Sequence, residues 1–158
     1  MSVRGAGQQS VLVVDDEPSV RTMLGYVLQD EGYDVREAAD GAEAITELTV
    51  SPPDAMILDL MMPNVDGFDV LRARRDRGIA PDTRVLILTA KTGTEDAVWC
   101  WELGADEYLV KPVDPDKLAW EMRMLLSRTP LALERRREVG LADARERDRI
   151  EAAFDKKP

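Results

Sequence analysis

The chain has 158 residues and a formal net charge of −10, from 31 acidic and 21 basic side chains. Such an acidic chain is not expected to bind nucleic acid directly, because binding to phosphates needs a cationic surface. Its single cysteine, Cys100, excludes an intramolecular disulfide, and no apolar run approaches the ~18 residues of a membrane span, so we expect a cytoplasmic protein without membrane insertion.

Short apolar runs alternate with helical patterns along most of the chain. Five runs are short enough to be strands, at residues 11–14, 34–38, 55–58, 85–88 and 107–110. Most of them are continuous, as in strands buried on both faces of a parallel sheet, whereas residues 34–38 are polar enough for a sheet edge. Helical patterns separate them, beginning near Pro18 and Ala42 and then covering residues 68–77, 95–103 and 114–127. This alternation predicts an α/β fold, a doubly wound parallel sheet with helices on both faces.

Two further segments flank this domain, which is expected to span residues 10–128. Residues 1–9 are expected to be a flexible N-terminus, and residues 129–158 a charged extension that is helical in part. Residues 131–158 hold eight Lys/Arg and seven Asp/Glu, a charge of +1, so residues 1–130 carry −11. The composition predicts helices at residues 131–138 and 141–154 with a break at Gly140, either solvated or docked on this domain or a partner.

Polar side chains follow four of the predicted strands at the point where each strand ends. Asp15 and Asp16 follow the first run, Asp59 follows the third, Thr89 the fourth and Lys111 the fifth. Each of these residues alone has an ordinary structural explanation, such as a helix cap for an aspartate or a solvated charge for the lysine. Together they point to one site, because ligands bind beyond the carboxyl ends of parallel strands.

Three clustered carboxylates need a compensating cation or shifted pKa values, since two of them ~4 Å apart repel by about 4 kcal/mol at an effective dielectric constant of 20. Hard oxygen ligands with open positions suit Mg²⁺, which commonly bridges carboxylates and phosphate oxygens. A carboxylate beside Mg²⁺ can attack a phosphoryl group and form an aspartyl phosphate. Lys111 would then neutralise the phosphoryl charge, and the Thr89 hydroxyl could bond one of its oxygens.

Four segments closely resemble the receiver domain of two-component response regulators, in the order and spacing of that family. They are VLVVDDE at residues 11–17, ILDLMMPNVDG at 57–67, VLILTA at 85–90 and GADEYLVKP at 104–112. The resemblance covers about residues 10–127. It implies a flavodoxin-like sheet with strand order 2-1-3-4-5 and a signalling module rather than an enzyme, one that catalyses only its own phosphorylation and dephosphorylation.

The resemblance also assigns roles to individual residues. It implies that Asp59 is the phosphoacceptor and that Asp15, Asp16, Asp59 and the Met61 backbone carbonyl hold Mg²⁺. Thr89 and Lys111 would then grip the phosphoryl group. Tyr108 resembles the aromatic residue that turns inward when the threonine moves, and Pro112 resembles a cis-proline of the family. The implied partners are a histidine kinase or phosphotransfer protein and a downstream protein target, reached through the face built by the fourth helix, fifth strand and fifth helix.

The sequence departs from the branch of the family whose members dimerise through salt bridges. Ala97 and Trp99 stand where that branch has basic residues, and Glu121 stands where it has an arginine. The acidic partners Asp106 and Glu107 are present. A dimer of that type is therefore not expected, although another homodimer stays open, and the 28 residues after Pro130 are too few for a DNA-binding domain.

Three other functions compete with a stand-alone receiver. A phosphatase of the haloacid-dehalogenase type also uses an aspartate, Mg²⁺, a threonine and a lysine, but it needs a second aspartate where this chain has Met61. A phosphorelay intermediate would have the same pocket. A receiver fragment of a longer regulator is the third alternative.

Two tryptophans suggest how the signal leaves the domain. Trp120 lies two positions after Leu118, about 200° around the helix from the apolar stripe. Trp99 replaces a cation on the preceding helix. We expect Trp99 and Trp120 to form an apolar patch covered by the C-terminal extension or by another chain, because tryptophan often anchors interfaces. The alternative is that Trp99 packs within its own domain.

Overall fold

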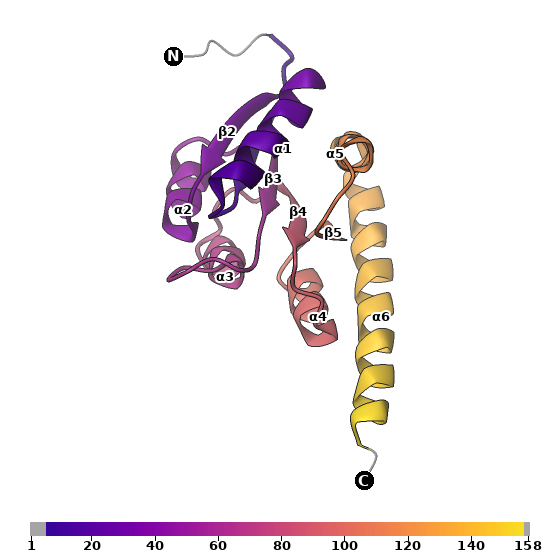
Figure 1. Ribbon diagram of the computed structural model, residues 1–158. Helices are drawn as coiled ribbons and strands as arrows, with labels where there is room; N and C mark the ends of the chain where they lie inside the picture. Colours follow the sequence, from indigo (N-terminus) through magenta and orange to yellow (C-terminus); the bar gives the residue numbers. More distant parts are fainter. Residues whose placement is uncertain (1–5, 157–158) are drawn as a thin grey trace.

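A computed structural model describes residues 6–156, and it contains one five-stranded sheet in which all strands are parallel. The strand order is β2-β1-β3-β4-β5, which confirms the predicted fold class (Figure 1). The strands are β1 (Ser10–Val14), β2 (Asp34–Ala38), β3 (Ala55–Leu58), β4 (Arg84–Thr89) and β5 (Glu107–Val110). Residues 1–5 and 157–158, which belong to the predicted flexible N-terminus and charged extension, lie outside the described residues.

Helices cover both faces of this sheet. They are α1 (Pro18–Asp30), α2 (Gly41–Val50), α3 (Gly67–Arg77), α4 (Thr94–Glu102), α5 (Pro115–Ser127) and α6 (Pro130–Asp155). Side chains alternate across β1, so Leu12 and Val14 pack in one core with α2, α3 and α4. Val11 and Val13 pack in the other core with α1 and α5. Within residues 6–156, no helix is both long and apolar enough to cross a membrane.

The predicted break at Gly140 is wrong, because α6 is one continuous helix of 26 residues. The Thr129 side chain caps it by accepting a hydrogen bond from the Ala132 N–H, and Pro130 stands in its first turn. Gly140 faces the domain, and a Cβ atom added there would overlap the Trp101 ring. The glycine therefore lets two elements approach closely rather than ending the helix.

This close approach predicts opposite effects for two helical glycines. Gly25→Ala in α1 adds a methyl group where no atom lies within 4 Å, so the free energy of unfolding should rise by up to about 1 kcal/mol. Gly140→Ala should instead lower it, because the buried Trp101 ring must move. Urea unfolding of both variants measures the difference, and a gain for Gly140→Ala equal to that of Gly25→Ala would refute the contact.

Candidate functional site

The carboxyl ends of four strands bring the predicted site residues together. Asp15 follows β1 and Asp59 follows β3, and the parallel register pairs Val14 with Leu58 just before them. Both carboxylates are buried, as is Thr89 at the end of β4. The Lys111 Nζ, beyond β5, donates hydrogen bonds to Asp15 Oδ2 at 2.6 Å and to Asp59 Oδ2 at 2.9 Å.

The ammonium of Lys111 is the charge that holds two buried carboxylates near each other. Burial by itself lowers the pKa of Lys111, but the hydrogen bonds with Asp15 and Asp59 and the attraction of both carboxylates outweigh it, so the pKa is raised. The lysine is therefore charged at neutral pH. Its peptide bond to Pro112 is cis, as the resemblance implied.

Three carboxylates can hold a metal ion at this edge of the sheet. One oxygen each from Asp15, Asp16 and Asp59 lies within 4.8 Å of the other two, and Asp16 is exposed while the other two are buried. Three acids against the single charge of Lys111 leave negative charge to compensate, and an all-oxygen donor set suits Mg²⁺. The residues therefore fit the metal that the sequence predicted.

The loop after β3 is shaped around Asp59. The Met61 N–H donates to Asp59 Oδ1 at 3.1 Å, while Lys111 donates to the other carboxylate oxygen, Oδ2. The assignment of the Met61 carbonyl as a metal ligand stays a prediction. Gly67 begins α3 directly against this loop, and a Cβ atom there would overlap the Asp59 carbonyl oxygen. A capping box between Asp66 and Asp69 starts the helix at that point.

Thr89 and Tyr108 meet through the backbone of Lys91. The Thr89 Oγ1 accepts a hydrogen bond from the Lys91 N–H at 3.2 Å, and the Tyr108 hydroxyl donates to the Lys91 carbonyl at 2.6 Å. Tyr108 is half-buried, and this burial, with smaller effects of Cys100 and Asp96, raises its pKa to about 12. The phenol is therefore neutral and available as a donor at neutral pH.

The two predicted interface tryptophans are both exposed, Trp99 by 40% and Trp120 by 52%. Trp99 makes an edge-on contact with Phe68 of α3, with ring centroids 5.9 Å apart. Trp120 is exposed. The indole that α6 covers is Trp101, which is 7% exposed and which the sequence analysis did not single out. The expectation of a Trp99 and Trp120 patch that α6 or another chain covers stays a prediction.

This combination of a five-stranded parallel sheet and an acidic pocket defines a receiver domain. The response regulator receiver domain model matches residues 11–123, and the chain belongs to that family. The acidic pocket of Asp15, Asp16 and Asp59 fits the phosphorylation site of the family.

Two curated relatives are DNA-binding or transcriptional regulators by name. The DNA-binding response regulator MtrA of Mycolicibacterium smegmatis is 43% identical over 122 residues, 77% of this chain and 52% of the relative. The alkaline phosphatase synthesis transcriptional regulatory protein PhoP of Bacillus subtilis is 40% identical over 124 residues, 78% of this chain and 51% of the relative. The chain thus spans about half the length of these relatives.

Solved receiver structures share the fold. The chemotaxis protein CheY4 of Vibrio cholerae has a TM-score of 0.70 and 36% identity, over 75% of this chain and 99% of that chain. TrrA of Thermotoga maritima, solved in complex with Mg(2+)-BeF, has a TM-score of 0.67 and 35% identity, over 75% of this chain and 99% of that chain.

The carboxylate cluster predicts that Mg²⁺ stabilises the folded protein. A ligand that binds only the folded state adds about 2.7 kcal/mol to the free energy of unfolding at 100 times its dissociation constant. Asp16→Asn removes one exposed ligand charge without disturbing the core, so it should abolish most of this gain. Asp30→Asn, an equal charge change on the exposed end of α1, should keep it. Urea unfolding with and without Mg²⁺ tests this, and an identical response of both variants would contradict the site.

Proposed function

We propose that this protein is a phosphorylation-controlled receiver that accepts a phosphoryl group on Asp59 from a histidine kinase or phosphotransfer protein. The observation that supports this most directly is a buried carboxylate held by Lys111 at 2.9 Å and flanked by two further acids. Burying clustered carboxylates costs free energy and does not by itself stabilise the fold. Such a cluster therefore indicates a site that binds a charged ligand.

The transfer step follows from the groups around Asp59. An oxygen of Asp59 attacks phosphorus and forms the new P–O bond, while the bond from phosphorus to the donor imidazole nitrogen breaks and that nitrogen keeps the electron pair. The Met61 N–H continues to hold Oδ1. Lys111 already contacts Oδ2, so its ammonium can follow the charge onto the phosphoryl oxygens. Asp15, Asp16 and Asp59, with the Met61 carbonyl, would hold Mg²⁺, and the ion would supply further positive charge to the site.

The same geometry supports a switch from Asp59 to the protein surface. Once a phosphoryl group is present, the Thr89 hydroxyl gains a charged acceptor and leaves the Lys91 N–H. The Tyr108 hydroxyl is hydrogen-bonded to the Lys91 carbonyl, so a movement of the Lys91 backbone changes the position of the Tyr108 ring. The phosphorylated and unphosphorylated states thus differ in contacts that bias Tyr108.

The output is proposed to be contact with a downstream protein through α4, β5 and α5. DNA binding is named for the relative MtrA, of which this chain matches about half, and we do not extend it to this chain. A phosphorelay intermediate is the second candidate, since its pocket would be identical. Transfer of phosphate from Asp59 to a histidine-containing phosphotransfer protein would distinguish it from a terminal receiver.

Phosphorylation should occur on Asp59 alone. With Mg²⁺ and a small phosphodonor, intact-mass measurement should show one added phosphoryl group. Asp59→Asn should remove it completely because the nucleophilic carboxylate is lost, whereas Asp76→Asn, on the exposed side of α3, should leave it unchanged. A phosphoryl group that persists on Asp59→Asn would exclude this assignment.

A beryllofluoride mimic should change the environment of Tyr108 through Thr89. The protein has three tyrosines, so ring-labelled NMR can follow Tyr108 with Tyr26 and Tyr33 as internal references. Thr89→Ala should still accept a phosphoryl group but lose most of the shift at Tyr108, because the hydroxyl link is gone. Thr46→Ala, on the surface of α2, serves as the matched control. A shift of the same size in Thr89→Ala would show that Tyr108 responds by another route.

A further inference from the structure

Helix α6 lies along α4 and across the end of β5, on the face proposed for output (Figure 1). Contacts run along most of its length. Near its start, Leu133 joins the core that contains α5. Further along, Arg145 pairs with Glu102 of α4 at 3.2 Å, and the Thr94 hydroxyl lies 2.8 Å from carboxylate oxygens of Asp148 and Glu151. The extension therefore docks on its own domain.

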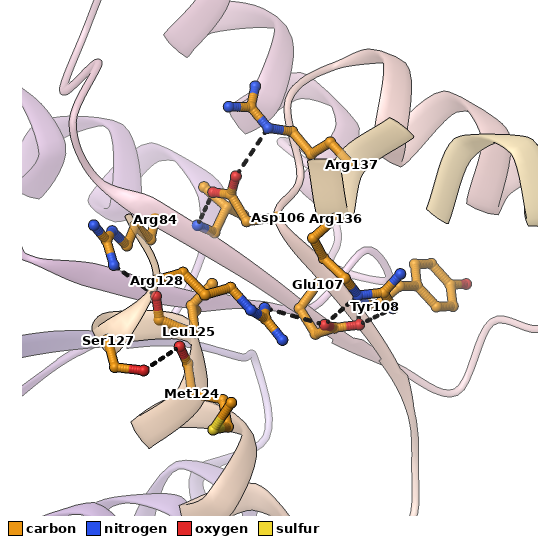
Figure 2. A network of polar contacts seen from close by, with 11 residues as sticks. Arg84, Asp106, Glu107, Tyr108, Met124, Leu125, Ser127, Arg128, Arg136 and Arg137 are labelled. Atoms are coloured by element: carbon orange, nitrogen blue, oxygen red, sulfur yellow. Dashed lines mark hydrogen bonds and ion pairs between the residues drawn. The ribbon is translucent and has the colours of Figure 1, made fainter. Parts of the chain in front are cut away.

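Glu107, the first residue of β5, is the centre of this contact (Figure 2). Its side chain is 5% exposed, and it accepts two hydrogen bonds from the Arg136 guanidinium of α6, at 3.0 Å and 2.7 Å. Arg128, between α5 and α6, lies 3.5 Å away. A buried carboxylate needs such partners, because it is strongly unfavourable without them. The cation that makes both short hydrogen bonds, Arg136, therefore comes from the segment that follows the domain.

Asp106 repeats this arrangement one residue earlier. Its Oδ2 accepts a hydrogen bond from the Val85 N–H at 2.9 Å, and Arg137 of α6 lies 3.2 Å from its Oδ1, in an orientation that makes an ion pair but not a hydrogen bond. Burial raises the pKa of the Asp106 carboxyl, while the Val85 N–H and the arginines oppose that rise. Two adjacent arginines of α6 thus face two adjacent acids of the domain.

The apolar part of the contact centres on Trp101. Gly140 lies directly against its ring, and the Arg136 guanidinium lies 5.0 Å from the ring centroid, within the range of a cation–π interaction. Three residues of α6 are buried, Leu133, Gly140 and Ala144, and two of them are small. Recognition of α6 therefore depends on arginines and on a small residue over an indole, rather than on a broad apolar stripe.

Packing beneath α6 is incomplete. A cavity of about 430 Å³ lies between α4, β5 and α6, and Tyr108 and Val110 line it together with Trp101, Arg136, Gly140 and Ala144. Val110 and Asp143 are exposed, so this space is a groove open to solvent rather than a void enclosed in a core. The helix is thus attached as a ligand would be, with the ring of Tyr108 forming part of the wall beneath it.

We propose that the surface of Trp101, Asp106 and Glu107 is a receptor for an arginine-bearing helix, and that α6 of the same chain occupies it. Phosphorylation of Asp59 releases α6, and a helix of the same chemistry in a target protein then takes its place. This inference rests on the proposed function for the role of phosphorylation. Charge complementarity identifies the partner, because the face offers two buried acids that need two cations. Movement of Tyr108 toward Thr89 withdraws a wall of the cavity, which loosens α6.

The docking step is tested first in the full chain without phosphorylation. Arg136→Glu should increase amide hydrogen exchange across residues 130–155 at least tenfold, because it places a carboxylate against Glu107. Arg135→Glu makes the same charge change on the exposed side of α6 and should leave exchange nearly unchanged. Equal exchange in the two variants would overturn the docking. Beryllofluoride with Mg²⁺ should raise exchange in α6 of the unaltered chain, and unchanged exchange would overturn the release.

The receptor is tested with residues 1–129 and a peptide of residues 130–156. Removing α6 should leave a folded domain, because CheY4 matches 75% of this chain over 99% of its own length. The peptide should bind in trans, Arg136→Glu in the peptide should weaken binding at least tenfold, and Glu107→Arg in the domain should restore part of that loss. Beryllofluoride should weaken binding of the unaltered peptide. Peptide that fails to bind the folded domain, or binds equally with Arg136→Glu, would refute the receptor.

Two controls separate the remaining explanations. Sedimentation of the full chain should show a monomer, and a dimer that dissociates in Arg136→Glu would overturn docking in cis by showing that α6 seats on a second copy. Intact mass on the same samples reports phosphorylation of Asp59. If Asp59 accepts no phosphoryl group, the proposed function and the release fail, while the exchange and peptide measurements without phosphorylation still decide the docking of α6.

Discussion

The two hydrogen bonds that Lys111 donates to Asp15 and Asp59 are the interaction on which the rest of this structure depends. Two buried carboxylates at one edge of a sheet repel each other, and a single ammonium at 2.6 Å and 2.9 Å holds them together. The lysine follows β5 while the acids follow β1 and β3, so the bridge forms only when all the strands run parallel and in register. A phosphoryl group or a metal ion would change the charges around Lys111. The contacts that hold the two carboxylates together are therefore also the contacts that change when a ligand binds.

The opposite end of the sheet has the same electrostatic problem with another solution. Asp106 and Glu107 are buried at the start of β5, where the cations come from Arg136, Arg137 and Arg128 beyond α5. Residues 1–130 carry a net charge of −11 and residues 131–158 a net charge of +1, so the acidic domain is followed by a segment that supplies cations. Lysine at one end can transfer its contacts to a ligand, and arginines at the other end can leave with the helix that holds them. At both ends of β5, cations compensate buried acids, and a binding partner can take over their contacts.

The strand ends could be predicted from the sequence because each apolar run is followed directly by a polar residue, and a parallel sheet brings such residues to one edge. The position of α6 could not be predicted in the same way. Helical patterns are usually found from apolar spacing, whereas the buried stripe of α6 contains Leu133, Gly140 and Ala144 among charged residues. In the sequence, Gly140 indicates a helix break. In the structure, the Trp101 ring lies against Gly140 and accounts for a glycine within a continuous helix. The missing cations opposite Asp106 and Glu107 were visible in the sequence, but their replacement by Arg136 and Arg137 depends on where the chain turns after α5.

The contacts of α6 differ enough in strength to show why a modest signal can move it. Arg145 and Glu102 are about half exposed, and such pairs contribute about 0.2–1 kcal/mol. Glu107 with Arg136 is the more buried pair and contributes more to the docking. Arg128 stays beside Glu107 when α6 leaves, so release does not leave this carboxylate without a cation. The groove beneath the helix is open to solvent, so that part of α6 lacks the dispersion contacts that a packed core would supply. Coupling between sites is typically about 1–3 kcal/mol, which is a 5- to 150-fold change in an equilibrium. A shift of this size acting through Tyr108 is sufficient for a helix whose attachment rests on one dominant ion pair, but it would not displace an element of the packed core.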